Sequence, residues 1–92
     1  MEPKSFETHD LYLAAALKIS GFRFIRLKLN ERGRGSFIFE DKDNRSQIVE
    51  DFFSGRLVGS LKSFTNAWAD FKNLFYEMES MEEKDGRQNS RR

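Results

Sequence analysis

The stretch that decides the fold is residues 60–81, SLKSFTNAWADFKNLFYEMESM. Its apolar residues recur every three or four positions, a spacing that places them on one face of an α-helix. They are Leu61, Phe64, Ala67, Trp68, Phe71, Leu74, Phe75 and Met78. Burying one large apolar side chain contributes about 1.5–3 kcal/mol, so the rest of the chain must supply a surface that covers this face. We therefore predict a long amphipathic helix around which a small domain packs.

The composition is that of one small globular domain. The chain has 92 residues, of which 38% are hydrophobic and ten are Phe, enough for one core. Because there is no Cys, the sequence excludes disulfides, Cys-based zinc sites and thiol nucleophiles. No apolar run reaches the ~18 residues of a membrane span, and the first residues lack a signal-peptide pattern. We expect a cytoplasmic protein that has no membrane contact.

The sequence before the long helix predicts a helix, a β-hairpin and a second, shorter helix. The hairpin is indicated by Ile25, Leu27 and Leu29, which alternate with Arg26 and Lys28 as in a half-buried strand. Glycines that follow both predicted helices supply the left-handed conformation common at helix ends. The predicted elements are a helix at 10–20, a strand at 22–29, a turn at 31–35, a strand at 36–40 and a short helix at 44–53.

The predicted fold is an α+β domain of the order α-β-β-α-α, with an antiparallel two-stranded hairpin packed on three helices. A lone hairpin is marginal in water, so helices must cover one of its faces. We expect a single domain at residues 8–80, a flexible N-terminus at residues 1–7 and a disordered charged tail at residues 81–92. Residues 56–59 are predicted to be an extended link, with a marginal third strand as the alternative.

Several short motifs resemble a family of short prokaryotic and phage domains of unknown function. Residues 6–15 match F-x-T-x-D-L-Y-L-A-A, residues 18–22 match K-x-x-G-F, and residues 37–41 match F-x-F-E-D. The resemblance extends over residues 5–76. The chain departs from the family pattern in Trp68, in a more basic hairpin and in its charged tail. Because the family has no established activity, the resemblance implies a fold class and brings no functional site.

The hairpin has the sharpest functional pattern in the chain. Five cations and one acid lie between residues 22 and 35, a local charge of 5 − 1 = +4. The cations are Arg23, Arg26, Lys28, Arg32 and Arg34. A basic ribbon of this kind is suited to contact the phosphates of DNA or RNA, and Phe22 or Phe24 on the same face would stack on bases. The alternative is a solvated strand face whose charges prevent edge-to-edge aggregation.

Residues around the long helix predict a contact with another protein. The helix carries more aromatic surface than its few partners would cover, and aromatic residues and Met are enriched at protein interfaces. The residues that we expect at such a contact are Leu57, Val58, Phe75 and Met78. The contact would join the chain to a larger partner protein or form a homodimer. The alternative is that all four residues belong to the core.

The sequence has no recognisable catalytic or metal-binding pattern. His9 is the only histidine, and no Ser-His-Asp set has a known spacing. Asp41 and Asp43 resemble the start of a calcium loop, but Phe52 stands where the bidentate Glu is needed. We predict no catalytic residue, no metal site and no cofactor. The expected function is a non-catalytic accessory or adaptor domain that binds a larger partner protein, in one version within a nucleoprotein complex. The alternative is a nucleic-acid-binding domain that uses residues 22–35.

Overall fold

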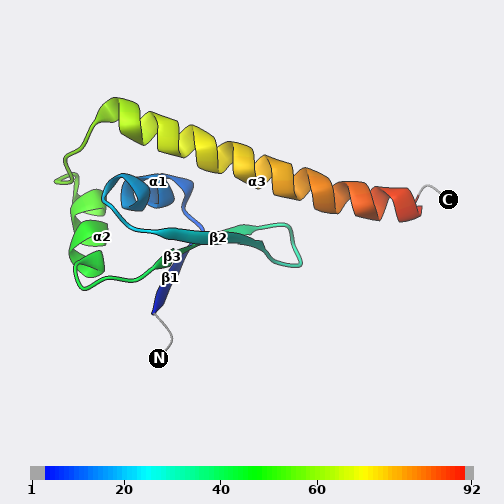
Figure 1. The fold of residues 1–92 in the computed structure, drawn as a ribbon, viewed down its shortest axis with the longest axis horizontal. Helices are drawn as coiled ribbons and strands as arrows, with labels where there is room; N and C mark the ends of the chain where they lie inside the picture. The colour runs from blue at the N-terminus through cyan, green and yellow to red at the C-terminus, as the bar shows by residue number, and fades with distance from the viewer. Residues whose placement is uncertain (1–3, 91–92) are drawn as a thin grey trace.

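Over the residues that the structure describes, the chain folds into an α+β domain with three helices and a three-stranded antiparallel sheet (Figure 1). The computed structural model describes the backbone of residues 4–90 and the side chains of residues 4–81. Its elements are β1 (Ser5–Thr8), α1 (Leu11–Ile19), β2 (Phe24–Leu29), β3 (Gly35–Glu40), α2 (Arg45–Ser54) and α3 (Leu61–Ser90). The predicted α+β class is therefore confirmed, and the order of elements needs one correction.

The correction is a third strand at the N-terminus. The sheet has the order β1-β3-β2, so β3 is central and β1 pairs antiparallel with it. In this pairing Phe6 lies opposite Phe39, and Thr8 lies opposite Phe37. The predicted two-stranded sheet was thus one strand short. Strand β1 pairs with the edge of β3 that a lone hairpin would leave unpaired. Strand β1 covers residues 5–7 of the segment that was expected to be flexible, and Thr8 just beyond it. Residues 56–59 form no strand.

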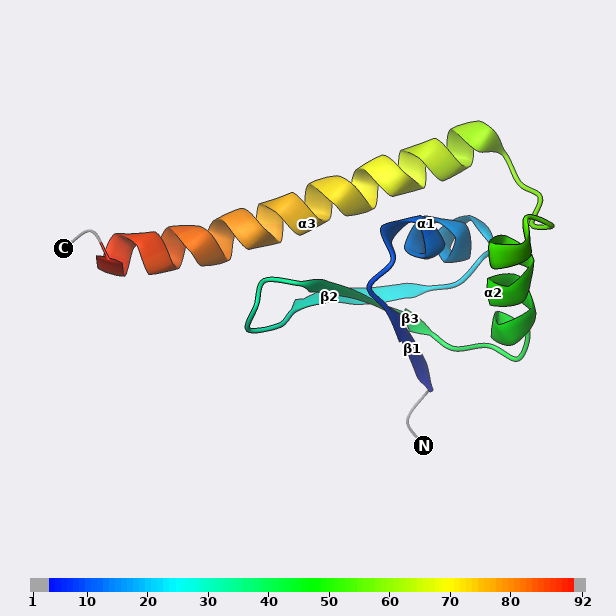
Figure 2. The same ribbon diagram turned by 180° about the vertical axis from the view of Figure 1, so that it is seen from behind.

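The elements form layers on one side of the sheet. Figures 1 and 2 show α1 between α3 and the sheet, with α2 at the end of the sheet away from the hairpin turn. No described helix covers the other face of the sheet. The core lies between the layers and is formed by Leu13, Ala14, Leu17, Phe22, Leu27, Phe37, Phe39 and Phe71.

Strand β2 contains a bulge that changes which side chains face the core. Phe24 pairs with Phe39, but the next paired residue is Arg26, so Ile25 is an extra residue in the ladder. An extra residue shifts the alternation of faces. Leu27 is buried at 5% exposure, whereas Ile25 is 41% exposed. The prediction that Ile25 shares the inner face of Leu27 is therefore wrong.

Side-chain caps fix the start of two helices. The Asp10 carboxylate accepts hydrogen bonds from the backbone N–H groups of Tyr12 and Leu13, at 2.9 and 3.1 Å, and begins α1. The Ser60 hydroxyl accepts from the Ser63 N–H at 3.1 Å and begins α3. Helix α3 then continues to Ser90, through most of the segment 81–92 for which a disordered tail was expected. Residues 91 and 92 lie outside the described residues.

Candidate functional site

The turn of the basic hairpin is held by the side chain of Asn30. Its Oδ1 accepts from the backbone N–H groups of Arg32 and Arg34, both at 2.9 Å. The Gly33 N–H donates to the Asn30 carbonyl at 3.0 Å, and Gly33 has a φ of +80°, which favours glycine. The two arginine side chains are left exposed at the tip. The sequence predicted this turn from its glycines and missed the role of Asn30.

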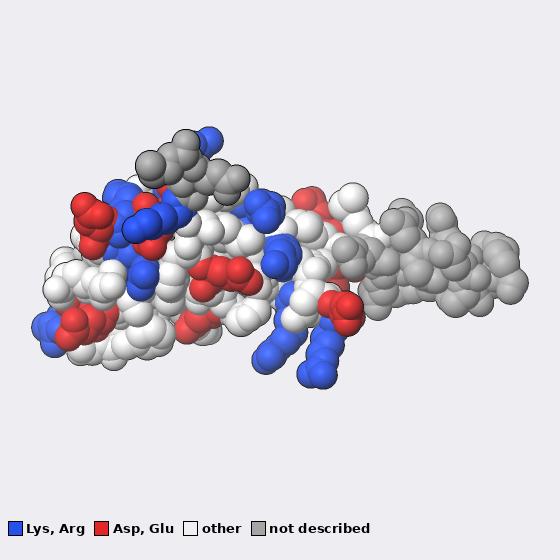
Figure 3. Space-filling model, turned by 90° about the horizontal axis from the view of Figure 1, so that it is seen from below, with Lys and Arg blue, Asp and Glu red and all other residues white. Residues whose placement is uncertain are grey.

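The remaining cations of the hairpin lie along β2 and just before it. Arg26 and Lys28 are exposed and flank the buried Leu27, so they lie on the face of the sheet away from the helices. Figure 3 views this face: basic and acidic side chains are interspersed over it, and long basic side chains project from its hairpin end. Arg23 lies 3.9 Å from Glu40, an exposed pair that contributes little.

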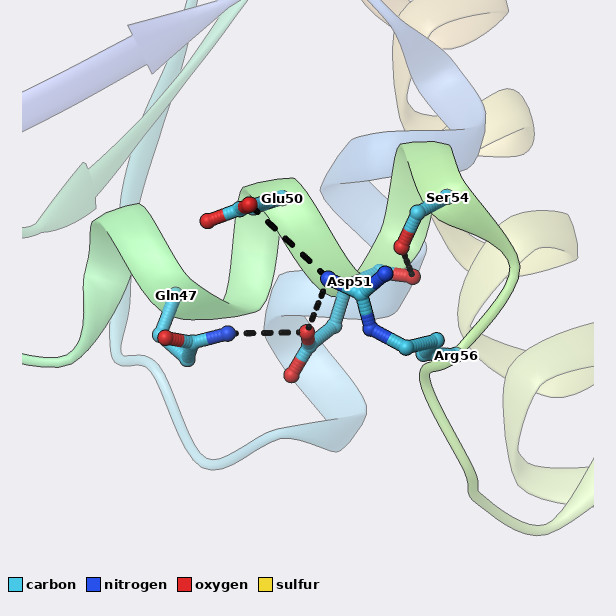
Figure 4. A network of polar contacts seen from close by, with 5 residues as sticks. All are labelled: Gln47, Glu50, Asp51, Ser54 and Arg56. Carbon is cyan, nitrogen blue, oxygen red and sulfur yellow. Dashed lines mark hydrogen bonds and ion pairs between the residues drawn. The ribbon is translucent and has the colours of Figure 1, made fainter.

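The acids of α2 do not neutralise the hairpin. The Asp51 carboxylate accepts from Gln47 Nε2 at 2.9 Å and from the Arg56 guanidinium at 3.4 Å, which also lies 3.8 Å from Glu50 (Figure 4). The Asp51 carbonyl accepts from the Ser54 hydroxyl. This network links Arg56, which follows α2, to the carboxylates of Glu50 and Asp51 within the helix. Within the part of the chain whose side chains the structure describes, the cations at positions 26, 28, 32 and 34 form no ion pair.

Phe24 is not available to stack on a base. Its ring packs into the core, with centroid distances of 4.9 Å to Phe71, 5.5 Å to Phe39 and 6.4 Å to Phe37. The bulge after Phe24 places it on the helix-covered face, opposite to the strand cations. The expectation that Phe24 shares a face with Arg26 is therefore corrected.

The four residues expected at a protein contact do not form one surface. Leu57 and Val58 precede α3, while Phe75 and Met78 lie farther along it and pack partly against the core. At ~1.5 Å per residue, the helix places Phe75 about 20 Å from its first turn. Val58 is 91% exposed. Two further apolar side chains, Phe53 in α2 and Leu61 at the start of α3, are 64% and 81% exposed.

A groove lies between the hairpin tip and α3. It has a volume of about 370 Å³ and draws its lining from the β1–α1 corner, the hairpin and α3. The lining residues are His9, Leu11, Gly33, Arg34, Gly35, Phe37, Trp68, Lys72, Phe75 and Tyr76. The groove therefore combines aromatic rings with basic groups, and no carboxylate is among its described lining residues.

On the α3 side of the groove, a lysine and aromatic rings pack against one another. Lys72 Nζ lies 4.7 Å from the centre of the Trp68 ring and 6.0 Å from that of Tyr76. Such cation–π contacts stabilise by about 0.5–1 kcal/mol at exposed sites. Tyr12 of α1 stacks on Trp68 with a centroid distance of 6.1 Å and an interplanar angle of 17°. The Trp68 indole N–H is buried and has no acceptor among the described residues.

His9 connects the β1–α1 corner to the hairpin. Its Nδ1 lies 3.1 Å from the Gly35 carbonyl oxygen and 3.1 Å from the Ser36 hydroxyl. A protonated Nδ1 donates to the Gly35 carbonyl, whereas an unprotonated Nδ1 accepts from the Ser36 hydroxyl, so either tautomer ties His9 to β3. Sequence reasoning found no catalytic or metal-binding role for His9 and missed the groove. One signal was readable: Trp68, Lys72 and Tyr76 follow one another at four-residue spacing on one side of α3.

Comparison with known proteins places the chain in a family. Residues 3–77 match the family described as Domain of unknown function (DUF5659). The chain belongs to this family. The predicted membership in a family of domains of unknown function is confirmed to that extent, while the opening motif itself stays untested. No curated protein and no solved structure matches the chain. Among the described residues, no helix is both long and apolar enough to cross a membrane.

Proposed function

We propose that this protein is a non-catalytic accessory domain that contacts nucleic acid with its basic hairpin, as part of a nucleoprotein complex in the cytoplasm of a prokaryote or a phage-infected cell. One observation carries the proposal. The cations Arg26, Lys28, Arg32 and Arg34 are exposed along β2 and at the tip, with no ion pair among the described side chains. Exposed cations can pair with the phosphates of a nucleic acid.

The geometry of the hairpin supports a backbone contact rather than base readout. Arg26 and Lys28 are two residues apart on one strand, ~6.6 Å along its axis, and Arg32 and Arg34 continue the row beyond the strand end. A row of separated cations suits the repeat of a phosphate backbone. Because the whole chain has a net charge of only +1, we expect modest affinity that falls steeply with salt.

Charge reversal at the tip tests this proposal. The variant carrying Arg32→Glu and Arg34→Glu should bind a fluorescein-labelled oligonucleotide more weakly in fluorescence anisotropy, with a smaller dependence on salt. Neither substitution touches the backbone N–H groups that hold the turn, so the fold should persist.

The matched control reverses two lysines far from the hairpin. The variant carrying Lys18→Glu and Lys62→Glu changes the net charge by the same amount, on exposed sites of α1 and α3. It should retain most of the affinity. Equal losses of affinity in both variants would show that only the total charge matters and not its position in the hairpin. The absence of any salt-dependent binding to DNA or RNA would refute the proposal.

A second candidate function is docking to a partner protein at the α2–α3 corner. It is favoured by three large exposed apolar side chains between the end of α2 and the start of α3, Phe53, Val58 and Leu61, because exposed apolar surface marks interaction sites. Light scattering would detect a homodimer, and an affinity pull-down would detect another partner. The variant carrying Val58→Asp and Leu61→Asp should abolish the association. A strictly monomeric protein that recovers no partner would contradict this candidate.

A further inference from the structure

We infer that the groove between the hairpin tip and α3 binds one unstacked nucleotide of a single-stranded nucleic acid. The inference rests on the proposed function and adds to it a second contact and a choice of strand form. The tip cations Arg32 and Arg34 would contact the phosphate backbone, while the groove beside the tip would receive one base with its phosphate.

The lining of the groove suits an anionic ligand that carries an aromatic ring. Arg34 and Lys72 contribute basic side chains from opposite walls, and no described acid opposes them. The remaining surface is mostly aromatic. Proteins that bind single strands combine a positively charged groove with aromatic side chains on which bases stack.

Lys72 is held where a phosphate would meet it. Its ammonium group lies against the rings of Trp68 and Tyr76, at 4.7 and 6.0 Å from their centres. An ammonium group over two rings still has donors directed to solvent, since cation–π contact occupies only one side of it. The side chain is therefore ordered before any ligand arrives, which lowers the entropy cost of binding.

Tyr76 offers the stacking surface. It is 52% exposed and lines the groove, and its ring lies 5.8 Å from that of Phe75 at an angle of 54°. A tilted neighbour fixes the ring without covering both of its faces. Trp68, by contrast, already stacks with Tyr12 on one face and meets Lys72 on another side. Tyr76 is thus the ring most accessible to a base.

The size of the groove selects a single strand. Its volume of about 370 Å³ is at the low end of small-molecule pockets, ~300–1,000 Å³. This is room for one nucleotide and far less than a duplex needs. A base can enter only if it is unpaired and unstacked from its neighbours, which costs least in a single strand.

The fluorescence of Trp68 tests the inference separately from the hairpin proposal. Trp68 is the only tryptophan in the chain and lies on the groove wall, so its emission reports occupancy. A labelled oligothymidine strand is titrated while anisotropy and tryptophan emission are recorded. We expect both signals to saturate together and a duplex of equal length to leave the emission unchanged.

Two variants and their controls complete the test. Tyr76→Ala should weaken single-strand binding roughly 5- to 150-fold, the range expected for one stacking contact. Lys72→Gln removes a phosphate contact, so it should weaken binding and reduce its dependence on salt. The exposed aromatic Phe53 and the exposed Lys62 of α3 supply the controls Phe53→Ala and Lys62→Gln, which should bind like the natural chain.

The outcomes separate the two proposals. Binding with no change in Trp68 emission and no effect of Tyr76→Ala would overturn the groove site and leave the hairpin contact standing. Equal binding of single strand and duplex with equal emission changes would also overturn the choice of strand form. Absence of any binding would refute the groove site together with the hairpin contact.

Discussion

Gly35 at the start of β3 lies directly against the ring of Phe75 on α3. A Cβ atom at position 35 would lie 2.8 Å from Phe75 Cδ1 and 3.0 Å from Cε1. Cβ atoms do not come this close to other atoms, so the hairpin and α3 meet here only because residue 35 has no side chain. The Gly35 carbonyl also bonds to His9. Gly35 and Phe75 both line the groove, so this contact is part of its wall.

Gly35→Ala should destabilise the domain by about 1–3 kcal/mol, the cost of overpacking a well-filled site. The added methyl group would press on Phe75 and on Leu27, which lies 3.2 Å from the Cβ position. Urea denaturation of the natural chain and the variant measures the difference. Combining Gly35→Ala with Phe75→Leu should cost less than the sum of the single changes, because they relieve the same clash. Gly33→Asn is the comparison: no atom lies within 4 Å there, so its cost comes only from the φ of +80°, which Asn tolerates better than most residues, and it should be smaller than that of the clash at position 35.

Asp10→Ala should reduce the free energy of unfolding by about 0.5–2 kcal/mol. The change removes the acceptor for two N–H groups at the start of α1. Asp10→Asn retains a side-chain oxygen and should cost much less. Chemical denaturation followed by circular dichroism compares the three proteins. Equal stability of Asp10→Ala and the natural chain would show that the cap is dispensable.

Phe71→Ala should destabilise the domain by about 3–5 kcal/mol and prevent folding if the total stability is small. Phe71 is 5% exposed, and its ring contacts Phe24, Phe37 and Phe39 of the sheet. The comparison is Phe53→Ala on α2, where the ring is 64% exposed and the cost should be below about 0.5 kcal/mol. Thermal unfolding measures the stability of both variants. Equal melting temperatures would contradict the packing of α3 on the sheet.

Removal of residues 1–8 should destabilise the protein by at least about 2 kcal/mol, because Phe6 loses its burial against the core. The truncation also exposes the edge of β3, so aggregation should increase. Denaturant midpoints and light scattering measure both effects. An unchanged denaturant midpoint would contradict this prediction and support the flexible N-terminus that the sequence predicted for residues 1–7.

The sequence predicted the helices well because their signals are local. The spacing from Leu61 to Met78 gave α3, and Asp10 with Gly21 bounded α1. Strand β1 was missed because Ser5–Thr8 offers only four residues with one large apolar side chain, too short for a period to emerge. The end of α3 could not be located from the sequence, because the apolar pattern stops at Met81 and the residues after it give no periodic signal.

The candidate site was predicted in part. The row of hairpin cations is contiguous in sequence and was found. The position of Phe24 in the core was not predicted, because a β-bulge depends on the pairing partner rather than on the strand itself. The groove was also missed, since His9, Arg34 and Lys72 come from three distant segments that only the folded chain brings together.

The most direct test of the central claim is the salt dependence of binding to a single-stranded oligonucleotide. Plotting the logarithm of the association constant against that of the salt concentration gives a slope of about −0.7 for each phosphate contact. Neutralising two tip residues with Arg32→Gln and Arg34→Gln should make this slope shallower by about 1.4, in line with two lost contacts. An identical slope for both proteins, or binding that does not respond to salt, would contradict a hairpin that pairs with phosphates.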